Sequence, residues 1–267
     1  MLILFIGDIV GRPGRECVGR LLPALRSEYP LDLVIANGEN AAGGFGLTPA
    51  IAQEFFSVGI DALTLGNHTW AQKEIIPYLD TDAPVVRPLN FPPGTPGRGV
   101  RIVRSRQGID VALLNLMGRV FMDPLDSPFR AADVALLEIG STMPVIVDMH
   151  AEATSEKIAL GNYLDGRVSA VLGTHTHVPT ADARLLPKGT LYLTDVGMVG
   201  PYNSVIGAEV EGTVRRFITQ LPLRTDRPDK IPGPVSFNSA LLEIDSQTGQ
   251  GMSIRRLDIL DDAPVQE

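Results

Sequence analysis

The chain has 267 residues, a hydrophobic fraction of 44% and a formal charge of −8. This acidic balance gives no overall basic field, so neither duplex nucleic acid nor a membrane surface is expected as a partner. A single cysteine, Cys17, excludes an internal disulfide framework and any metal site built from several cysteines. No apolar run approaches the roughly 18 residues of a membrane span, so we expect a soluble cytoplasmic protein. The length fits one domain over residues 1–267.

The first half of the chain alternates short apolar runs with longer helical patterns, which predicts parallel strands joined by crossover helices. Strands are expected at residues 2–8, 31–40 and 61–68, and helices at 13–26 and 50–59. Pro13 fits the first turn of a helix, whereas Pro23 favours a kink or an end. Thr48 and Pro49 are a typical helix start. The next helix, near Trp70, is expected to be short.

The second half predicts a mixed sheet, because expected hairpins interrupt this alternation. The hairpins fall at residues 100–118, 183–197 and 240–260, and buried strands at 144–150 and 168–175. Helices are expected at 128–140, 155–166 and 208–220, and a proline-rich surface loop at 227–236. The predicted fold class is therefore α/β, with a mixed sheet.

Polar side chains occupy the carboxyl ends of five of the expected strands. All four histidines of the chain are among them. In an open α/β sheet the carboxyl ends of parallel strands form the rim where ligands bind, so we expect these segments to share one site. The residues that we interpret as metal ligands are Asp8, Glu39, Asn40, Asn67, His150, His175 and His177.

The chemistry of these side chains suits a pair of metal ions. Imidazole, carboxylate and amide oxygen bind iron, manganese or zinc, and seven ligands are too many for one tetrahedral ion. Two ions about 3.5–4 Å apart with one shared ligand can clamp an in-line displacement at phosphorus. Side chains two residues apart on a strand point the same way, so His175 and His177 can aim at one place and serve different metals.

Most of these positions also have an ordinary structural explanation. Such explanations account for each position separately and leave the shared location a coincidence. Three arginines and a Thr-Ser pair could also contact phosphate, with surface solvation and helix capping as the respective alternatives. For the predicted metal ligands, the ordinary explanations are a helix cap for Asp8 or Asn67–His68, a turn for Glu39–Asn40 and a core position for His150. For the residues that could contact phosphate, they are solvation for Arg12, Arg15 and Arg119 and a helix cap for Thr154–Ser155.

The strings FIGD, GNH and GTHTH, in that order, resemble the calcineurin-like metallophosphoesterases. The motif series of that superfamily is D-x-H, G-D-x-x-D, G-N-H-[DE], a lone H and G-H-x-H. Here Val10 replaces the first histidine, Glu39 replaces the second motif's aspartate, and Thr69 stands where an acid is usual. These departures resemble the narrower YmdB-like phosphodiesterases, and GDIVGRPGR, NGENAAGGFGLT, GNHTW, DMHAEATSEK, GTHTHVPTAD and TDVGMVGPYNSVIG extend the likeness over nearly the whole chain.

The resemblance implies an α/β sandwich of mixed β-sheets flanked by helices, and a role for each candidate residue. It implies that Glu39 bridges two ions and that His68 protonates the leaving oxygen. Because Thr69 stands where an acid is usual, the group that orients the His68 ring is left open. The other implied ligands are Asp8, Asn40 and His177 on one ion and Asn67, His150 and His175 on the other.

The implied activity is that of a phosphodiesterase acting on 2′,3′-cyclic or 3′,5′-cyclic nucleotides. The expected reaction is attack on phosphorus by a hydroxide held between the ions. Iron and manganese are the first candidates for the metals, with zinc as an alternative, and a homo-oligomer is one expectation. The alternatives are a phosphomonoesterase and a non-catalytic regulatory metalloprotein. A dinucleotide-binding turn at Gly7, Gly11 and Gly14 has the wrong glycine spacing.

Overall fold

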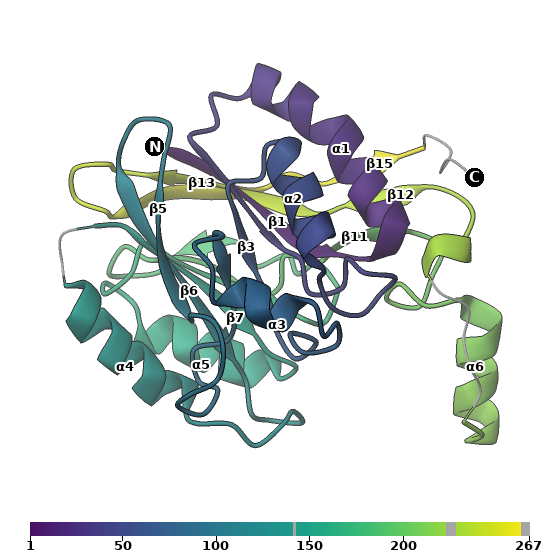
Figure 1. The fold of residues 1–267 in the computed structure, drawn as a ribbon. Helices are drawn as coiled ribbons and strands as arrows, with labels where there is room; N and C mark the ends of the chain where they lie inside the picture. The colour runs from purple at the N-terminus through teal and green to yellow at the C-terminus, as the bar shows by residue number, and fades with distance from the viewer. Residues whose placement is uncertain (141–142, 223–227, 263–267) are drawn as a thin grey trace.

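The computed structural model describes residues 1–140, 143–222 and 228–262, and two β-sheets pack between layers of helices (Figure 1). The helical segments are α1 (Gly11–Glu28), α2 (Pro49–Ser57), α3 (Ile75–Leu79), α4 (Pro128–Ile139), α5 (Thr154–Tyr163), α6 (Val210–Thr219) and the 3₁₀ turn η1 (Pro228–Lys230). The strands of the first sheet are β1 (Leu2–Ile9), β2 (Leu33–Asn37), β3 (Ala62–Thr64), β4 (Val85–Val86), β11 (Met198–Pro201), β12 (Val235–Phe237), β13 (Ser239–Ile244), β14 (Gly251–Arg256) and β15 (Ile259–Asp261). Those of the second are β5 (Val100–Arg104), β6 (Asp110–Met117), β7 (Val145–His150), β8 (Ala170–Thr174), β9 (Arg184–Leu185) and β10 (Leu191–Leu193).

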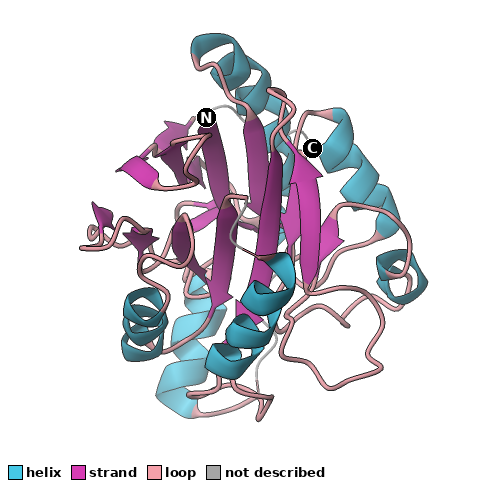
Figure 2. Cartoon of the chain, turned by 90° about the vertical axis from the view of Figure 1, so that its left-hand side faces the viewer, coloured by secondary structure: helices cyan, strands magenta, loops and turns pink. Residues whose placement is uncertain are grey.

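Both sheets are mixed, as the sequence predicts. The first has the order β15-β12-β11-β1-β2-β3-β4, and β13 pairs with the early part of β1. The second has the order β5-β6-β7-β8-β10-β9. The three expected hairpins, β5–β6, β9–β10 and β13–β14, are all antiparallel pairs. Figure 2 shows the strands at the centre of the molecule with helices around them.

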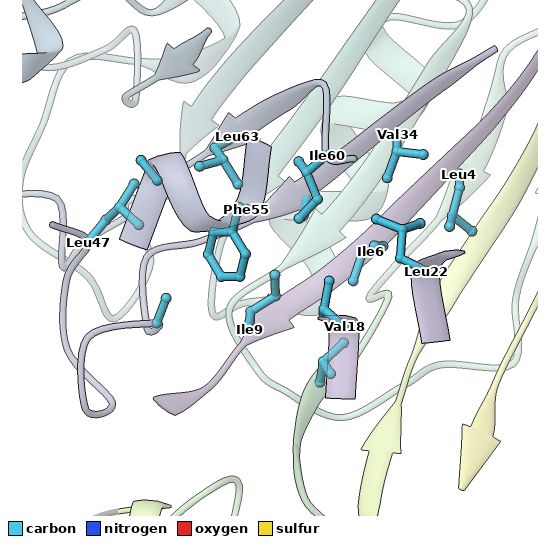
Figure 3. Packing of buried hydrophobic residues seen from close by; sticks show 14 of the residues in the cluster. Leu4, Ile6, Ile9, Val18, Leu22, Val34, Leu47, Phe55, Ile60 and Leu63 are labelled. Carbon is cyan, nitrogen blue, oxygen red and sulfur yellow. The ribbon is translucent and has the colours of Figure 1, made fainter. Parts of the chain in front are cut away.

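Three buried apolar clusters hold these layers together. One lies between the first sheet and helices α1 and α2, one between the two sheets, and one between the second sheet and helices α4 and α5. Figure 3 shows the first of them, where Phe55 of α2 and Leu22 of α1 lie over β1 and β2. Burying one such side chain completely stabilises the folded state by about 1.5–3 kcal/mol relative to leaving it exposed. Both sheets are covered on both faces, which explains why β2 and β7 are apolar runs with little alternation.

Side-chain caps set the starts of α2, α4 and α6. Thr48 accepts a hydrogen bond from the Ile51 amide ahead of α2, and Ser127 accepts one from Arg130 ahead of α4. Pro23 neither ends nor interrupts α1, which continues to Glu28. The expected helix near Trp70 begins only at Ile75, although it is short as predicted.

Two sequence expectations about the fold need correction. The five polar segments do not end on one sheet, because β1, β2 and β3 belong to the first sheet and β7 and β8 to the second. The proline-rich segment 227–236 is not simply a surface loop, since Pro228 is buried in η1 and β12 begins at Val235; residue 227 lies outside the described residues. No helix in the described ranges is long and apolar enough to cross a membrane.

Candidate metal centre

The seven predicted ligands come together where the two sheets meet at the carboxyl ends of their parallel strands. Parallel pairing places these ends side by side within each sheet: Asp8 of β1 pairs with Asn37 of β2, and His150 of β7 with Thr174 of β8. The packing of one sheet on the other then joins the two rows. Contacts of 4 Å or less link all seven residues: Asp8, Glu39, Asn40, Asn67, His150, His175 and His177.

An inner cluster surrounds the Nε2 atom of His150. Glu39 Oε1 and Asn67 Oδ1 each lie 2.9 Å from this nitrogen, and His175 Nδ1 lies 3.1 Å from it. Glu39, His150 and His175 can each offer one ligand atom, all within 4.8 Å of one another. Glu39 and His150 are almost completely buried. This geometry suits a cation held by nitrogen and oxygen donors.

An outer cluster lies on the other side of Glu39. His177 Nε2 is 3.1 Å from Asn40 Nδ2 and 3.8 Å from Asp8 Oδ1. Asn40 Nδ2 is also 3.4 Å from Glu39 Oε1, so Glu39 faces both clusters. Asp8 Oδ1 is fully buried and has no hydrogen-bond partner within the described part of the chain. A buried carboxylate oxygen without a partner is costly, and a bound cation would satisfy it.

Each of the three clustered imidazoles has its other nitrogen engaged away from the centre. His177 Nδ1 lies 2.8 Å from the carbonyl oxygen of Ile206, His150 Nδ1 lies 2.9 Å from Thr174 Oγ1, and His175 Nε2 lies 3.2 Å from Glu152. A carbonyl only accepts hydrogen bonds, so Nδ1 of His177 carries the proton and its Nε2 is a bare lone pair. When the rings are neutral, protons on the corresponding distal nitrogens leave His150 and His175 each with a lone pair facing the inner cluster, where a cation can bind.

Thr174 is itself held by a buried network. Its hydroxyl lies 2.6 Å from Asp148 Oδ1, and Asn37 Nδ2 lies 3.1 Å from the other oxygen of that carboxylate. With Asp148 ionised, the Thr174 hydroxyl donates to it and is left to accept from His150. All of these side chains are completely buried. The imidazole of His150 is therefore fixed in one orientation.

The electrostatics of the centre favour positive charge between the clusters. Burial alone lowers the pKa of His150, but the Glu39, Asp8 and Asp148 carboxylates outweigh it and raise that pKa to about 9. Burial raises the pKa of Glu39, but His150 and His68 outweigh it and bring that pKa to about 2. Asp8 has its pKa raised to about 6, chiefly by burial. Either a proton or a metal ion can supply the charge that these acceptors demand.

Backbone strain, and not strand alternation, aims His175 and His177. Strand β8 ends at Thr174, and the φ angles of His175 and His177 are 98° and 65°. The prediction that both lie on one face of a strand is therefore wrong, although both do reach the centre. Asp195 holds the loop between them: its Oδ2 accepts from the Thr176 amide at 3.2 Å and from Lys157 Nζ at 2.6 Å. Positive φ at a non-glycine residue persists only where the surroundings enforce it.

His68 sits beside the centre, with its backbone amide donating to Glu39 Oε2 at 2.9 Å. Thr69 does not orient the ring, because its hydroxyl donates to the Gly66 carbonyl. The ring instead has its Nε2 atom 3.3 Å from Asn67 Nδ2 and meets Phe45 in a T-shaped contact with centroids 5.0 Å apart. Burial lowers the pKa of His68, and the charge on Glu39 partly offsets this. Gly66 permits the close approach, since a Cβ there would fall 2.2 Å from the His150 ring.

Several of the ordinary structural explanations do not hold. Asp8 does not cap α1, whose N-cap is Val10 with no side-chain bond, and no helix begins at Trp70 for Asn67 or His68 to cap. Ala153, and not Thr154, occupies the N-cap of α5. Arg15 donates to the Ala41 carbonyl at 2.7 Å and pairs with Glu54, so it braces the loop after β2.

Sequence reasoning missed the residues that support the histidines. Asn37 and Asp148 each lie two residues before a predicted ligand, Glu39 and His150 respectively, inside an otherwise apolar strand. Because residues at i and i+2 share a strand face, a polar residue at that spacing signals a supporting side chain. Lys157 and Asp195, each 1% exposed, carry no comparable signal, since they lie on different elements 38 positions apart.

A cavity of about 280 Å³ opens onto the centre. Ligand sites of this kind are concave and combine an apolar wall with a few converging polar groups. The lining residues are Val10, Glu39, Asn40, Gly44, Phe45, His68, His175, His177, Ile206, Gly207, Ala208 and Pro228.

Two helix-flanked mixed sheets with a cluster of carboxylate, amide and imidazole groups at their shared edge define a calcineurin-like metallophosphoesterase, a class of metal-dependent hydrolases. The model of the YmdB-like protein family matches residues 4–257, and the chain belongs to that family.

Individual relatives agree with this assignment. The chain is 50% identical over 98% of both chains to a Bacillus subtilis protein described as 2′,3′-cyclic-nucleotide 2′-phosphodiesterase. A Thermus thermophilus structure described as a hypothetical protein is 49% identical, with a TM-score of 0.90 over 98% of this chain and 100% of that one. A phosphatase structure from Mycoplasma pneumoniae is 34% identical, with a TM-score of 0.91 over 98% and 94%.

Proposed function

We propose that the protein is a dinuclear metal-dependent phosphodiesterase that hydrolyses cyclic nucleotides. The 2′,3′-cyclic nucleotides are the first class to test, because the B. subtilis relative is described as acting on them. The 3′,5′-cyclic nucleotides are the second. The observation that carries the metal assignment is the arrangement of the three imidazoles, each of which directs one ring nitrogen at the centre around Glu39 and Asp8 while its other nitrogen is engaged.

Each cluster supplies the ligands of one ion in this proposal. Asn67, His150 and His175 belong to the inner ion, and Glu39 is shared. Asp8, Asn40 and His177 belong to the outer ion, where rotation of the Asn40 amide by half a turn exchanges its nitrogen for its oxygen. Bound there, the cations supply positive charge that offsets the charge developing on the phosphoryl oxygens. Iron and manganese are the first candidates and zinc the third, since all three accept this set of donors.

His68 acts as the general acid. It lines the cavity beside Glu39 but lies outside both clusters of ligands. As the oxygen of a water molecule bonds to phosphorus and the bond between phosphorus and the ribose oxygen breaks, His68 in its protonated form gives its proton to the ribose oxygen, which leaves as a hydroxyl. A positioned general acid of this kind typically contributes about 10²- to 10⁴-fold to the rate.

The test is hydrolysis of 2′,3′-cyclic AMP, bis-p-nitrophenyl phosphate and p-nitrophenyl phosphate after metal removal and separate addition of Mn²⁺ or Fe²⁺. We expect metal-dependent cleavage of the diesters, a loss of at least about 10³-fold in Glu39→Gln, and two ions per chain by elemental analysis. His68→Ala should keep both ions and lose about 10²- to 10⁴-fold in kcat.

Each other outcome points to one of the alternatives. Two bound ions without turnover of any of these substrates would favour a regulatory metalloprotein. Turnover of the monoester alone would favour a phosphomonoesterase. Equal activity in both variants and the wild type would overturn the catalytic assignment.

The exposed face of α6 supports a homo-oligomer. The helix stands away from the body of the molecule (Figure 1), and residues 214–222 are all exposed. Its exposed apolar residues Val210, Val214 and Phe217 follow the 4-3 spacing of a helix-pairing seam. Glu209 and Glu211 lie at one end and Arg215 and Arg216 lie toward the other, so an antiparallel second copy would pair opposite charges.

This part of the proposal is tested by light scattering on the size-fractionated protein. Phe217→Asp should reduce the mass to that of one chain, whereas Leu137→Asp, at an 84%-exposed position on α4, should leave it unchanged. A wild-type protein that already has the mass of one chain would refute the oligomer without touching the catalytic assignment. The cytoplasmic location and the single domain over residues 1–267 stay predictions.

A further inference from the structure

The cavity over the metal centre has two unlike walls. One wall carries the polar groups of the centre, including Glu39, His68 and His177. The rest of the lining is apolar and has no role in holding a metal or moving a proton. Its side chains are those of Val10, Phe45, Ile206, Ala208 and Pro228.

Phe45 is an exposed aromatic residue on a rigid loop. Its side chain is 59% exposed, yet its carbonyl accepts from Gln72 Nε2 at 2.7 Å. The Gly44 amide donates to the Asn40 carbonyl at 3.1 Å, and the Gly46 amide donates to the Glu39 carbonyl. The positive φ angles of Gly44 and Gly46, 97° and 83°, allow this tight course. The loop therefore fixes Phe45 beside His68 instead of letting it fold into the core.

The part of the lining around Ile206 is also preformed. The segment before α6 is closed by paired hydrogen bonds between Val205 and Ala208 at 2.8 and 2.9 Å, and the Gly207 amide donates to Ser204 Oγ at 2.9 Å. Ile206 has a φ of 48°, an unusual value for a β-branched residue, and its side chain is 54% exposed at the cavity. An apolar side chain is thus held outward under strain at the mouth of the site.

We propose that Phe45 and the apolar wall around Ile206 form the subsite for the nucleobase, with Phe45 stacking on the base while the phosphodiester lies at the metal centre. This inference rests on the proposed function. It explains how the enzyme would select cyclic nucleotides over phosphodiesters that have no base. An aromatic side chain can stack on any nucleobase, because every base has a π-face. The apolar side chains of this wall offer no hydrogen-bonding groups to a base edge, so selection is for stacking area and purines are preferred to pyrimidines.

Phe45 also has a second possible role, because its ring contacts His68. A residue that only orients His68 would change kcat for every substrate. A residue that stacks on the base changes KM, and only for substrates that have a base. The two roles therefore predict different kinetic signatures.

The experiment compares Phe45→Ala, Phe45→Leu and Phe45→Trp with the wild type on 2′,3′-cyclic AMP and on ethylene cyclic phosphate, which lacks a base. We expect Phe45→Ala to raise KM for 2′,3′-cyclic AMP about 5- to 150-fold with kcat nearly unchanged, Phe45→Trp to restore it and Phe45→Leu to fall between. Ethylene cyclic phosphate should show no change. Tyr163→Ala, which removes an exposed aromatic at the far end of α5, is the matched control and should behave as wild type.

Equal losses on both substrates would overturn the subsite and assign Phe45 to positioning His68. A binding measurement separates failure of the subsite from failure of the proposed function. In the metal-loaded protein, 3′-AMP should bind more tightly than inorganic phosphate by calorimetry, and Phe45→Ala should reduce that difference by the same factor. If the wild type hydrolyses no cyclic nucleotide but this difference holds, the function is wrong and the base subsite stands. If 3′-AMP and phosphate bind equally, the base subsite is wrong.

Discussion

His150 and the pair His175–His177 direct ring nitrogens at the same centre, but the protein holds them in different ways. His150 ends strand β7, is completely buried, and is fixed by Thr174 and Asp148 inside the molecule. His175 and His177 follow β8 on a strained loop, and their partners, Glu152 and the Ile206 carbonyl, belong to half-exposed residues. One ligand is thus positioned by packing and the other two by a loop.

This difference locates the weak points of the centre. A ligand on a buried strand loses its orientation only if its network is broken, because the surrounding core is close-packed. A loop held in positive φ depends on whatever enforces that conformation, here the buried ion pair of Asp195 with Lys157. Support from an exposed partner contributes least, since water competes for it. Substitutions at these three kinds of support should therefore have effects of different size.

The largest effect is expected at the ion pair beneath the loop. Lys157→Met leaves the Asp195 carboxylate buried without its counter-charge, and we expect it to lower the free energy of unfolding by about 3–5 kcal/mol. It should also loosen Thr176 and with it both loop histidines. Urea unfolding of the metal-free protein measures the loss, and metal titration measures the consequence for the centre.

The double variant Lys157→Met/Asp195→Asn is the control for this prediction. It removes the uncompensated charge, so most of the lost stability should return. If Lys157→Met unfolds at the same urea concentration as the wild type, the ion pair does not support the loop, and the strained histidines must be held in another way.

The same contrast explains what could be predicted from the sequence. His150 and Glu39 end apolar runs, so strand periodicity was enough to place them at a sheet edge, and the mixed α/β class followed from the same patterns. The aim of His175 and His177 was predicted for the wrong reason, because alternation on a strand says nothing about a loop with φ angles of 98° and 65°. That geometry depends on Asp195 and Lys157, which tertiary packing brings together.

Short strands were the other limit of sequence analysis. β11 (Met198–Pro201) lies beside β1 and completes the sheet at Asp8, but its run of MVGP contains glycine and proline and has no strand pattern. The division into two sheets was likewise not readable from the residues, because parallel strands of either sheet are apolar on both faces. Only the resemblance to a known superfamily indicated the sandwich.

A smaller effect is expected when the support of His150 is removed. Thr174→Val keeps the shape of the side chain but deletes the hydroxyl that joins His150 Nδ1 to Asp148. Loss of such a partner typically weakens metal binding by about 10- to 100-fold, because the imidazole loses its fixed orientation and tautomer. Competition with a chelator of known affinity measures this for the more tightly held of the two proposed ions.

Thr174→Ser retains the hydroxyl and serves as the matched control. It should bind metal within a few-fold of the wild type. If Thr174→Val and Thr174→Ser bind metal equally well, the hydroxyl has no part in holding His150, and burial alone orients the ring.

The smallest effect is expected at the exposed partner of His175. Glu152→Ala removes the same kind of support, an acceptor for the distal nitrogen, but its side chain is 49% exposed. Water can take its place, and exposed pairs of this kind contribute about 0.2–1 kcal/mol, so metal affinity should fall by less than about 5-fold. Glu152→Gln, which keeps an acceptor oxygen, should be indistinguishable from the wild type. If Glu152→Ala weakened metal binding as much as Thr174→Val, burial of the partner would not set how strongly it supports its histidine. The contrast between the histidine held on a strand and the histidines held on a loop would then fail. A contrast based on which proposed ion each histidine binds would have to replace it.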